Sequence, residues 1–387
     1  MTGDEQRTIV ISAGEASGDL HGGNLVAALK EMLPGHRFIG VGGEAMARQG
    51  VELLYNAGQL GVTGMVEVLG RLGLIRRALR DLKRLIRSRP AALIVIDYPD
   101  FNFRLAQYAH KAGVPVFYYI SPQIWAWRTK RVKKIRRWVD VMLVILPFEV
   151  DFYNRYEVPV QFVGHPLLDQ WEAEGVHPMP PERREASVCL MPGSRENEIQ
   201  RLLPVMVEAV RELHEHHPAL KFFLLKAETI SPELLASTLR PVAHLVQVVT
   251  EGRRSLLARS RLVITASGTA TMEAGLAGTP MIVLYKMSGL TYKLVRRLVN
   301  IKYISMVNLL ADKETVPELI QDAANSRTVV EEAEALLANS GRWLEVHHDL
   351  LRLRARLGEP GASRRAGAAI AAKLAESSPP GQRTKPC

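Results

Sequence analysis

The chain alternates short runs of β-branched and other apolar residues with segments of helical periodicity, and this alternation limits the possible folds more than any other feature. Short apolar runs bounded by turn signals are typical of buried strands, and strands that alternate with helices indicate a parallel sheet. The runs are TIVISA, RFIGVGG, ALIVID, PVFYYI, VMLVIL and VQFVG in the first half, then SVCLMPGS, KFFLLKA, VQVVT, RLVITAS and PMIVLYK in the second. We expect a helix from about His21 to Met32 after the first run, and a long helix that ends near Arg89. The sequence therefore predicts an α/β protein with two Rossmann-like, doubly wound domains.

A break in this alternation predicts the domain boundaries. Periodicity is lost over QWEAEGVHPMPPERREAS, where three prolines cluster, and such a stretch is typical of a linker. We expect two domains that face each other across a cleft, where ligands would bind at the carboxyl ends of the strands. The expected parts are a first domain (1–170), a linker (171–187), a second domain (188–345), C-terminal helices that pack back on the first domain (346–375) and a disordered tail (376–387).

The composition indicates a globular, cytoplasmic protein with an anionic partner. Of the 387 residues 47% are hydrophobic, and every apolar run is far shorter than the roughly 20 residues of a membrane-spanning helix. Cys189 and Cys387 have no spacing that suggests a metal site or a disulfide framework. The formal net charge of +10 predicts attraction to nucleic acid, a membrane surface or phosphorylated substrates. No nucleic-acid recognition motif accompanies that charge, so we expect no nucleic acid among the partners.

The strongest local signal for ligand binding is RLVITASGTATMEAGLAGTPMIVLYK, residues 261–286. A buried strand leads into a turn that opens a helix, and the N–H groups and hydroxyls of such a turn suit a diphosphate. The Glu273 carboxylate, about one turn further on, could accept hydrogen bonds from a ribose diol. An ordinary N-cap cluster with a capping box would explain the same residues. The candidate ligand residues are Ser267, Gly268, Thr269, Thr271 and Glu273.

A companion signal is LMPGSRENEI, residues 190–199, at the end of the first strand of the second domain. Gly193 and Ser194 would form a tight turn, and the forked guanidinium of Arg195 could bind the phosphates of a leaving group. An exposed arginine without a ligand is the alternative. Together with the turn at Ser267, Arg195 would complete one phosphate site.

Two acidic stretches end strands of the first domain. Asp97 and Asp100 follow the run ALIVID, where either could cap a helix or act as a general base for a hydroxyl nucleophile. The stretch ISAGEASGDLHGG has the glycines of a phosphate loop, but Glu15 and Asp19 would repel a phosphate. The sequence leaves open which of these carboxylates are functional.

Two segments could account for the positive charge. Residues 71–89 carry eight Lys or Arg beside one Asp, and residues 128–137 carry seven basic residues and no acid. Such segments could bind an anionic lipid surface, or they could be solvated faces of ordinary helices. An excess of apolar side chains at the start of the first segment would enter the headgroup region as a membrane patch. The patch residues are Met65, Val66, Val68, Leu69, Leu72 and Leu74.

Several motifs, in order, make the chain resemble the lipid-A-disaccharide synthase family. The motifs, which run from about residue 8 to residue 322, are SAGEASGDLHGG, GVGGEAMARQGVELL, LGVTGMVEVLG, IDYPDFNFRLA, YISPQIWAWR, FVGHPLLD, LMPGSRENEI, SGTATMEAGLAGTPMIVLYK and NLLADKETVPELIQ. Tyr98 is a departure, because the family usually has a small residue there. The resemblance implies a GT-B glycosyltransferase that needs no metal or other cofactor.

The resemblance also implies a reaction. The family joins UDP-2,3-diacylglucosamine to 2,3-diacylglucosamine 1-phosphate (lipid X), which gives a β(1→6) disaccharide 1-phosphate and UDP. We expect Asp100 as the base, with Glu15 as second choice, and an enzyme at the inner membrane of a Gram-negative bacterium, with a homodimer as a suggested assembly. Another UDP-sugar enzyme, such as an epimerase, and a non-catalytic polyanion-binding protein are the alternatives.

Carried over to this chain, the family's sites fall at these positions: Arg195, Ser267, Gly268, Thr269, Thr271, Glu273, Asn308 and Glu314 at UDP; Glu15, Asp97 and Asp100 at the sugars, with Gly14, Ser17, Gly18 and Asp19 beside them.

Overall fold

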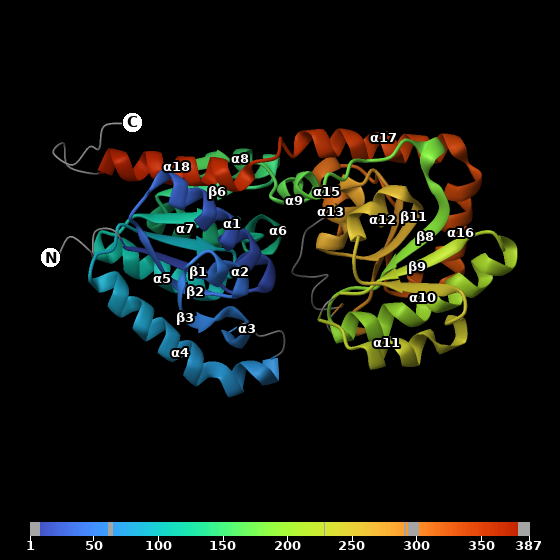
Figure 1. The fold of residues 1–387 in the computed structure, drawn as a ribbon, viewed down its shortest axis with the longest axis horizontal. Helices are drawn as coiled ribbons and strands as arrows, with labels where there is room; N and C mark the ends of the chain where they lie inside the picture. Colours follow the sequence, from blue (N-terminus) through green and yellow to red (C-terminus); the bar gives the residue numbers. More distant parts are fainter. Residues whose placement is uncertain (1–7, 61–64, 228, 290–291, 293–301, 378–387) are drawn as a thin grey trace. The chain divides into compact units, whose positions relative to one another are not determined.

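The computed structural model describes residues 8–60, 65–227, 229–289, 292 and 302–377 (Figure 1). The chain divides into two compact units. The first unit comprises residues 1–166 together with 359–387, and the second comprises residues 167–358. Each unit is built on one parallel sheet, as the alternation in the sequence predicts.

The first unit contains a seven-stranded sheet in the order β3-β2-β1-β4-β5-β6-β7, and every pairing in it is parallel. Its strands are β1 (Thr8–Ala13), β2 (Arg37–Gly42), β3 (Glu52–Asn56), β4 (Ala92–Ile96), β5 (Val116–Tyr119), β6 (Val141–Val144) and β7 (Val160–Phe162). Helices cover both faces, so the central strands are buried on both sides and read as continuous apolar runs.

The helices of the first unit form two layers. Helices α4, α5 and α7 contribute to the core on the face that Val10 and Val95 point to. Helices α1 and α18 contribute to the core on the opposite face, which contains Ile9 and Ile94. The described helices are α1 (Ala16–Met32), α2 (Glu44–Arg48), α3 (Ala57–Leu60), α4 (Met65–Arg87), α5 (Pro99–Ala112), α6 (Ile124–Trp127), η2 (Thr129–Arg131), α7 (Val132–Trp138), α8 (Pro147–Asn154) and α18 (Ala362–Ser377).

The second unit contains a six-stranded parallel sheet in the order β10-β9-β8-β11-β12-β13. Its strands are β8 (Glu185–Met191), β9 (Lys221–Leu225), β10 (Val246–Val249), β11 (Ser260–Ala266), β12 (Met281–Tyr285) and β13 (Glu318–Ile320). Its described helices are α9 (Leu167–Ala173), η3 (Pro181–Arg183), α10 (Glu196–His216), α11 (Pro232–Leu239), η4 (Arg240–Val242), α12 (Arg253–Arg259), α13 (Thr269–Leu276), α15 (Met306–Ala311), η5 (Gln321–Ala323), α16 (Ser326–Ala338) and α17 (Ser340–Arg356).

The boundary between the units lies before the expected linker, and the last two helices separate. The expected linker, 171–187, is part of the second unit and already contains the first residues of β8. Helix α17 also belongs to the second unit, whereas α18 packs against α1 in the first, where Gly367 lies close to Ala28 and Met32. Most of the expected tail, from residue 378 onward, lies outside the described residues.

One buried arginine explains why the proline-rich stretch is not a loose linker. The Arg184 guanidinium donates to the Thr279 hydroxyl at 2.6 Å, to the Ala277 carbonyl at 2.8 Å and to the Ser260 carbonyl at 3.0 Å. It also lies over the Trp343 ring, 5.4 Å from the centroid. These long-range contacts hold the stretch against the second sheet without any local periodicity.

Candidate active site

Each sheet has a point where the strand order reverses, and the candidate residues gather beside these two points. In the first unit the reversal lies between β1 and β4, and in the second between β8 and β11. The connections that follow the two strands at such a point run in opposite directions. This opens a crevice at the carboxyl ends of the two strands. Glu15 and Asp97 follow β1 and β4, whereas Arg195 and Ser267 follow β8 and β11.

The turn after β4 has an unusual backbone. Asp97 and Tyr98 both have positive φ angles, +43° and +47°, although neither is a glycine. Such a conformation costs about 1–3 kcal/mol per residue and persists only where the surroundings enforce it. The Tyr98 ring lies so close to Gly14 that an added Cβ there would be 2.1 Å from it, which explains the glycine after β1. The Tyr98 hydroxyl donates to the Leu60 carbonyl at 2.9 Å.

The Asp97 carboxyl group has the electrostatic environment of a general base. Burial and, to a smaller extent, the nearby Glu15 carboxylate raise its pKa from the ordinary value to about 6, while a hydrogen bond from the Tyr98 N–H lowers it. Glu15 itself is exposed at the N-cap of α1. A carboxyl group that is ionised above about pH 6 and is still basic can accept a proton near neutral pH.

Asp100 has a different environment, although it lies only one helical turn away. Its side chain is 76% exposed and forms ion pairs with Arg131 at 2.6 Å and Arg128 at 3.7 Å. These contacts satisfy the carboxylate at the first turn of α5. The two carboxylates of this turn therefore differ: desolvation raises the pKa of Asp97, whereas Asp100 is exposed and paired with arginines.

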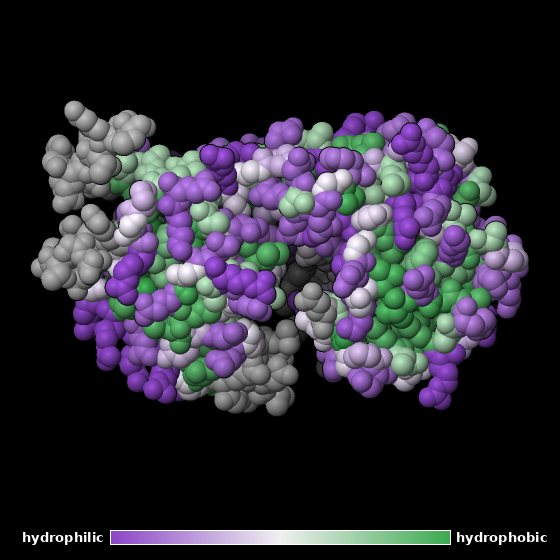
Figure 2. Space-filling model, in the orientation of Figure 1, coloured by the Kyte–Doolittle hydropathy of each residue, from purple (hydrophilic) through white to green (hydrophobic). Residues whose placement is uncertain are grey.

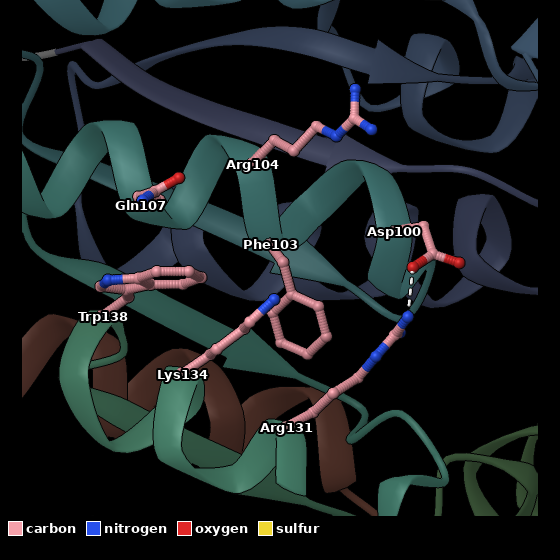
Figure 3. A pocket seen from close by; sticks show the side chains of 7 residues that line it. All are labelled: Asp100, Phe103, Arg104, Gln107, Arg131, Lys134 and Trp138. Carbon is pink, nitrogen blue, oxygen red and sulfur yellow. Dashed lines mark hydrogen bonds and ion pairs between the residues drawn. The ribbon is translucent and has the colours of Figure 1, made fainter. Parts of the chain in front are cut away.

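Asp100 also marks one end of a groove of about 260 Å³ between α5 and α7 (Figure 3). Arg104 and Gln107 project from α5, and Lys134 and Trp138 from α7 (Figure 3). In the described part of the chain, neither Arg104 nor Lys134 forms an ion pair. The groove therefore has an uncompensated positive charge.

The stretch around Glu15 and Asp19 is the end of a strand and the start of a helix. Helix α1 begins at Ala16, five residues before the expected start, so Ser17 and Gly18 lie in its first turn. Ser17 is exposed, and Gly18 is buried against Ala13 and Ile96.

Asp19 is a structural residue in this helix. Its carboxylate accepts the N–H groups of Gly43 at 2.6 Å, Ala45 at 2.9 Å and Met46 at 3.1 Å. Asp19 therefore caps helix α2, which differs from the expected contact with a sugar. This arrangement explains how two acids can share the stretch: Asp19 is bound by backbone donors, and Glu15 stays exposed.

The turn after β11 contains the residues that the sequence predicts for a diphosphate site. Gly268 has a φ of +144°, which L-residues rarely adopt, and it precedes α13. Thr269 is exposed at the first position of the helix, whereas Thr271 is buried and its hydroxyl donates to the Gly268 carbonyl at 2.8 Å. The Ser267 hydroxyl donates to the Ile304 carbonyl at 2.9 Å. Two of the three expected hydroxyls thus bind the protein's own backbone in this structure.

Glu273 lies further along α13 and pairs with Arg253 at 3.3 Å. Arg253 also donates to the Lys226 carbonyl at 3.1 Å, so it joins the ends of three strands. Arg253 is not among the residues predicted from the sequence, although its position three residues after the run VQVVT is a usable signal.

The turn after β8 presents Arg195 to solvent. Gly193 has a φ of +114°, and the N–H groups of Ser194 and Arg195 donate to the Glu198 carboxylate at 2.9 and 3.3 Å. The Arg195 guanidinium contacts the same carboxylate at 3.1 Å and its side chain is 60% exposed. The turn is therefore formed without a ligand. Arg195 can bind a ligand if it gives up its ion pair with Glu198.

Asn308 and Glu314, the other two expected UDP contacts, have different environments. Asn308 is buried, and its amide donates to Val316 and Glu318 and accepts from Thr315 and Val316. All hydrogen-bonding groups of this side chain are satisfied, so it is structural. Glu314 is exposed.

The expected membrane patch lies on α4. Met65, Val66, Val68 and Leu69 are helical, but their side chains lie outside the described part of the structure. Leu72 and Leu74 are half-buried, and Leu74 packs against the α4–α5 core, as an ordinary core residue would. Hydrophilic side chains gather along α4 at the lower left of Figure 2.

Two further properties concern ligands and membranes. No helix among the described residues is both long and apolar enough to cross a bilayer. The same residues contain no group of three or more His, Cys, Asp and Glu side chains that could hold a metal ion.

Solved structures share the fold of this chain. A putative UDP-N-acetylglucosamine 2-epimerase from Listeria monocytogenes matches with a TM-score of 0.63 and 14% identity, over 98% of this chain and 99% of the other. The calicheamicin glycosyltransferase CalG4 matches with a TM-score of 0.61 and 16% identity, over 97% and 100%. The fold is thus that of GT-B glycosyltransferases and the related epimerases.

Sequence relatives define the family. The profile of the family described as "Lipid-A-disaccharide synthetase" matches residues 9–373, and the chain belongs to this family of glycosyltransferases. The lipid-A-disaccharide synthase of Geobacter metallireducens is 43% identical over 374 residues, which cover 93% of this chain and 95% of that protein. The enzyme of Myxococcus xanthus is 41% identical over 381 residues, which cover 97% and 98%. The family resemblance in the motifs is therefore confirmed.

Proposed function

We propose that the protein transfers 2,3-diacylglucosamine from UDP to the 6-hydroxyl of 2,3-diacylglucosamine 1-phosphate. The observation that carries this proposal is the half-buried Asp97 carboxyl group, with a pKa of about 6, at the strand reversal of the first sheet. Membership of the lipid-A-disaccharide synthetase family supports the choice of substrates.

The proposed chemistry is a single displacement. The acceptor O6 attacks the anomeric carbon, the bond from that carbon to the UDP oxygen breaks, and Asp97 accepts the hydroxyl proton. The attack comes from the side opposite UDP, so the α-linked donor gives a β-linked product. Asp97 is preferred over Asp100 because a half-buried carboxyl group of raised pKa is the stronger base.

The second unit would stabilise the leaving UDP. Negative charge grows on the diphosphate as the bond breaks. The cationic Arg195 guanidinium and the partial positive charge at the N-terminus of α13 are suited to stabilise it. The Thr269 hydroxyl and the Gly268 N–H would add hydrogen bonds, and the Ser267 hydroxyl would donate one only by giving up its bond to the Ile304 carbonyl. Glu273, held by Arg253, would accept hydrogen bonds from the ribose diol.

The lipid chains require the enzyme to work at a membrane surface. Moving each CH₂ group from lipid into water costs about 0.8 kcal/mol, so acylated substrates stay in the bilayer. The basic residues of α4, α5 and α7, together with the groove that Arg104 and Lys134 line, would attract an anionic leaflet. We therefore propose peripheral binding to the inner membrane through this face of the first unit.

The test is an assay of UDP release in mixed micelles that contain UDP-2,3-diacylglucosamine, with and without lipid X. We expect UDP and a β(1→6) disaccharide 1-phosphate only when both lipids are present. UDP release from the donor alone, together with an epimerised sugar, would identify a UDP-sugar epimerase. Lipid binding without any UDP release would leave only the polyanion-binding alternative.

A further inference from the structure

The carboxylate of Asp97 is carried by a strained turn, and two buried side chains bind the backbone of that turn. We propose that Asn102 and Tyr118 are positioning residues, which hold the Asp97 carboxylate in place for proton transfer. This inference rests on the proposed role of Asp97 as the base.

Asn102 joins the two strands at the reversal of the first sheet. It is fully buried in α5, and its amide nitrogen donates to the carbonyls of Asp97 at 2.7 Å and Ile96 at 3.1 Å. Its amide oxygen accepts the Ser12 hydroxyl at 2.8 Å, from β1. One side chain therefore connects the end of β4 to its neighbour β1.

Tyr118 holds the same turn from the other side. It lies on β5, is fully buried, and its hydroxyl donates to the Asp97 carbonyl at 2.7 Å. The Asp97 carbonyl thus accepts two hydrogen bonds, one from an amide and one from a phenol.

These hydrogen bonds keep the turn in its strained conformation. The last ladder bond of this strand end is donated by the Asp97 N–H to the Tyr119 carbonyl at 3.3 Å, and beyond it two consecutive residues adopt positive φ. Without the Asn102 and Tyr118 donors, the Ile96 and Asp97 carbonyls would lose buried partners, and the turn would relax toward ordinary φ values. The carboxylate would then move away from its half-buried position.

Displacement of the Asp97 carboxylate should change the pH dependence of kcat. The groups that face Asp97 are Glu15 on α1, Tyr98 in the turn and Tyr118 on β5. Burial is the main cause of the raised pKa, so a carboxylate that becomes more exposed must have a lower pKa. The acid limb of the pH profile of kcat would then move to lower pH, because the base stays ionised in more acidic solution.

The test compares Tyr118→Phe with Tyr153→Phe in the full chain. Each change removes one hydroxyl from a buried tyrosine of the first unit, and the Tyr153 hydroxyl bonds the Ser121 hydroxyl at 2.7 Å, not the Asp97 turn. We expect Tyr118→Phe to lower kcat about tenfold with an unchanged KM for lipid X, and to shift the acid limb to lower pH. Tyr153→Phe should keep both the kcat and the acid limb of the wild type. A wild-type kcat and limb in Tyr118→Phe, or equal changes in both variants, would overturn the inference.

Asn102→Ala removes more bonds and should lower kcat further, but this buried position is also important for folding. Tyr118→Phe therefore decides the question if Asn102→Ala does not fold. Asp97→Asn, measured in parallel, distinguishes the positioning role of Tyr118 and Asn102 from the role of Asp97 as the base. If Asp97→Asn is inactive while Tyr118→Phe behaves as wild type, only the positioning role is wrong, whereas an active Asp97→Asn would remove the proposed base itself.

Discussion

The two units present the same edge of a parallel sheet, but they build its turns from different residues. Beside the strand reversal of the second unit, the positive φ angles after β8 and β11 belong to glycines, Gly193 and Gly268. Beside the reversal of the first unit, the positive φ angles after β4 belong to Asp97 and Tyr98, and Asn102 and Tyr118 bind the backbone of that turn. The topology decides where a site can form, and the residues of the turn decide which chemistry it can perform.

The difference follows from what each turn must present. A glycine turn exposes backbone N–H groups to an anion without steric cost, which suits a diphosphate. A turn with a side chain at the bend can place a carboxylate beside the sheet, at the cost of strain. The first unit thus has an acid suited to accept a proton, and the second has cations and N–H groups suited to phosphate.

Loss of the acid should have the largest effect. We expect Asp97→Asn to lower kcat by about 1,000-fold, because the amide cannot accept the proton, with little change in KM. Initial-rate kinetics with both lipid substrates provide the measurement. Asp100→Asn is the matched control, and it should stay within about threefold of the wild type, since exposed ion pairs contribute little. The opposite ranking of these two variants would restore Asp100 as the base.

Loss of the main cation of the second unit should come next. Arg195→Ala should lower kcat by roughly 100-fold, because the charge on the leaving diphosphate is no longer stabilised, and UDP should inhibit the variant less strongly. Arg201→Ala changes another exposed arginine on α10 and should leave both quantities unchanged. An Arg195→Ala variant with normal turnover would show that the leaving group is stabilised elsewhere.

The groove between α5 and α7, which Arg104 and Lys134 line, is a basic surface of the first unit. The double variant Arg104→Ala/Lys134→Ala should bind anionic vesicles roughly 30-fold more weakly at low salt, since each cation near the leaflet contributes about 1 kcal/mol. Co-sedimentation with phosphatidylglycerol vesicles measures this binding. Arg211→Ala/Arg240→Ala removes two exposed cations of the second unit and should bind as the wild type does. Equal losses in both double variants would indicate attraction by net charge alone.

The smallest effect concerns the pH profile. In the wild type kcat should rise with pH through about 6, as Asp97 becomes ionised. Glu15→Gln removes a negative charge that raises the pKa of Asp97, so the acid limb should move to lower pH. Burial is the larger cause and persists in the variant, so the limb should stay above the ordinary range of an aspartate. A limb that moves to higher pH would contradict the assigned interaction.

Much of the architecture could be predicted from the sequence. The two parallel sheets follow from apolar runs such as ALIVID and RLVITAS, because burial on both faces leaves a continuous apolar pattern in a strand. The turn at Gly268 was predictable as well, since a glycine between a strand and a helix has a local conformational reason. The sequence predicts the start of α1 near His21, but the helix begins at Ala16. The glycines of ISAGEASGDLHGG resemble those of a loop, although Gly18, Gly22 and Gly23 lie in a helix that packs closely on its neighbours.

The fold class, the positions of the strand ends and the family can therefore be predicted from the sequence alone. These depend on periodicity and on short motifs, which are local properties of a chain. Which carboxylate is exposed and which is bound by backbone donors depends on the tertiary structure. Asp19 is satisfied by N–H groups 24 to 27 residues away, and Asn102 by a serine 90 residues away. A polar side chain becomes structural or functional through partners that the fold brings to it, and no local pattern records those partners.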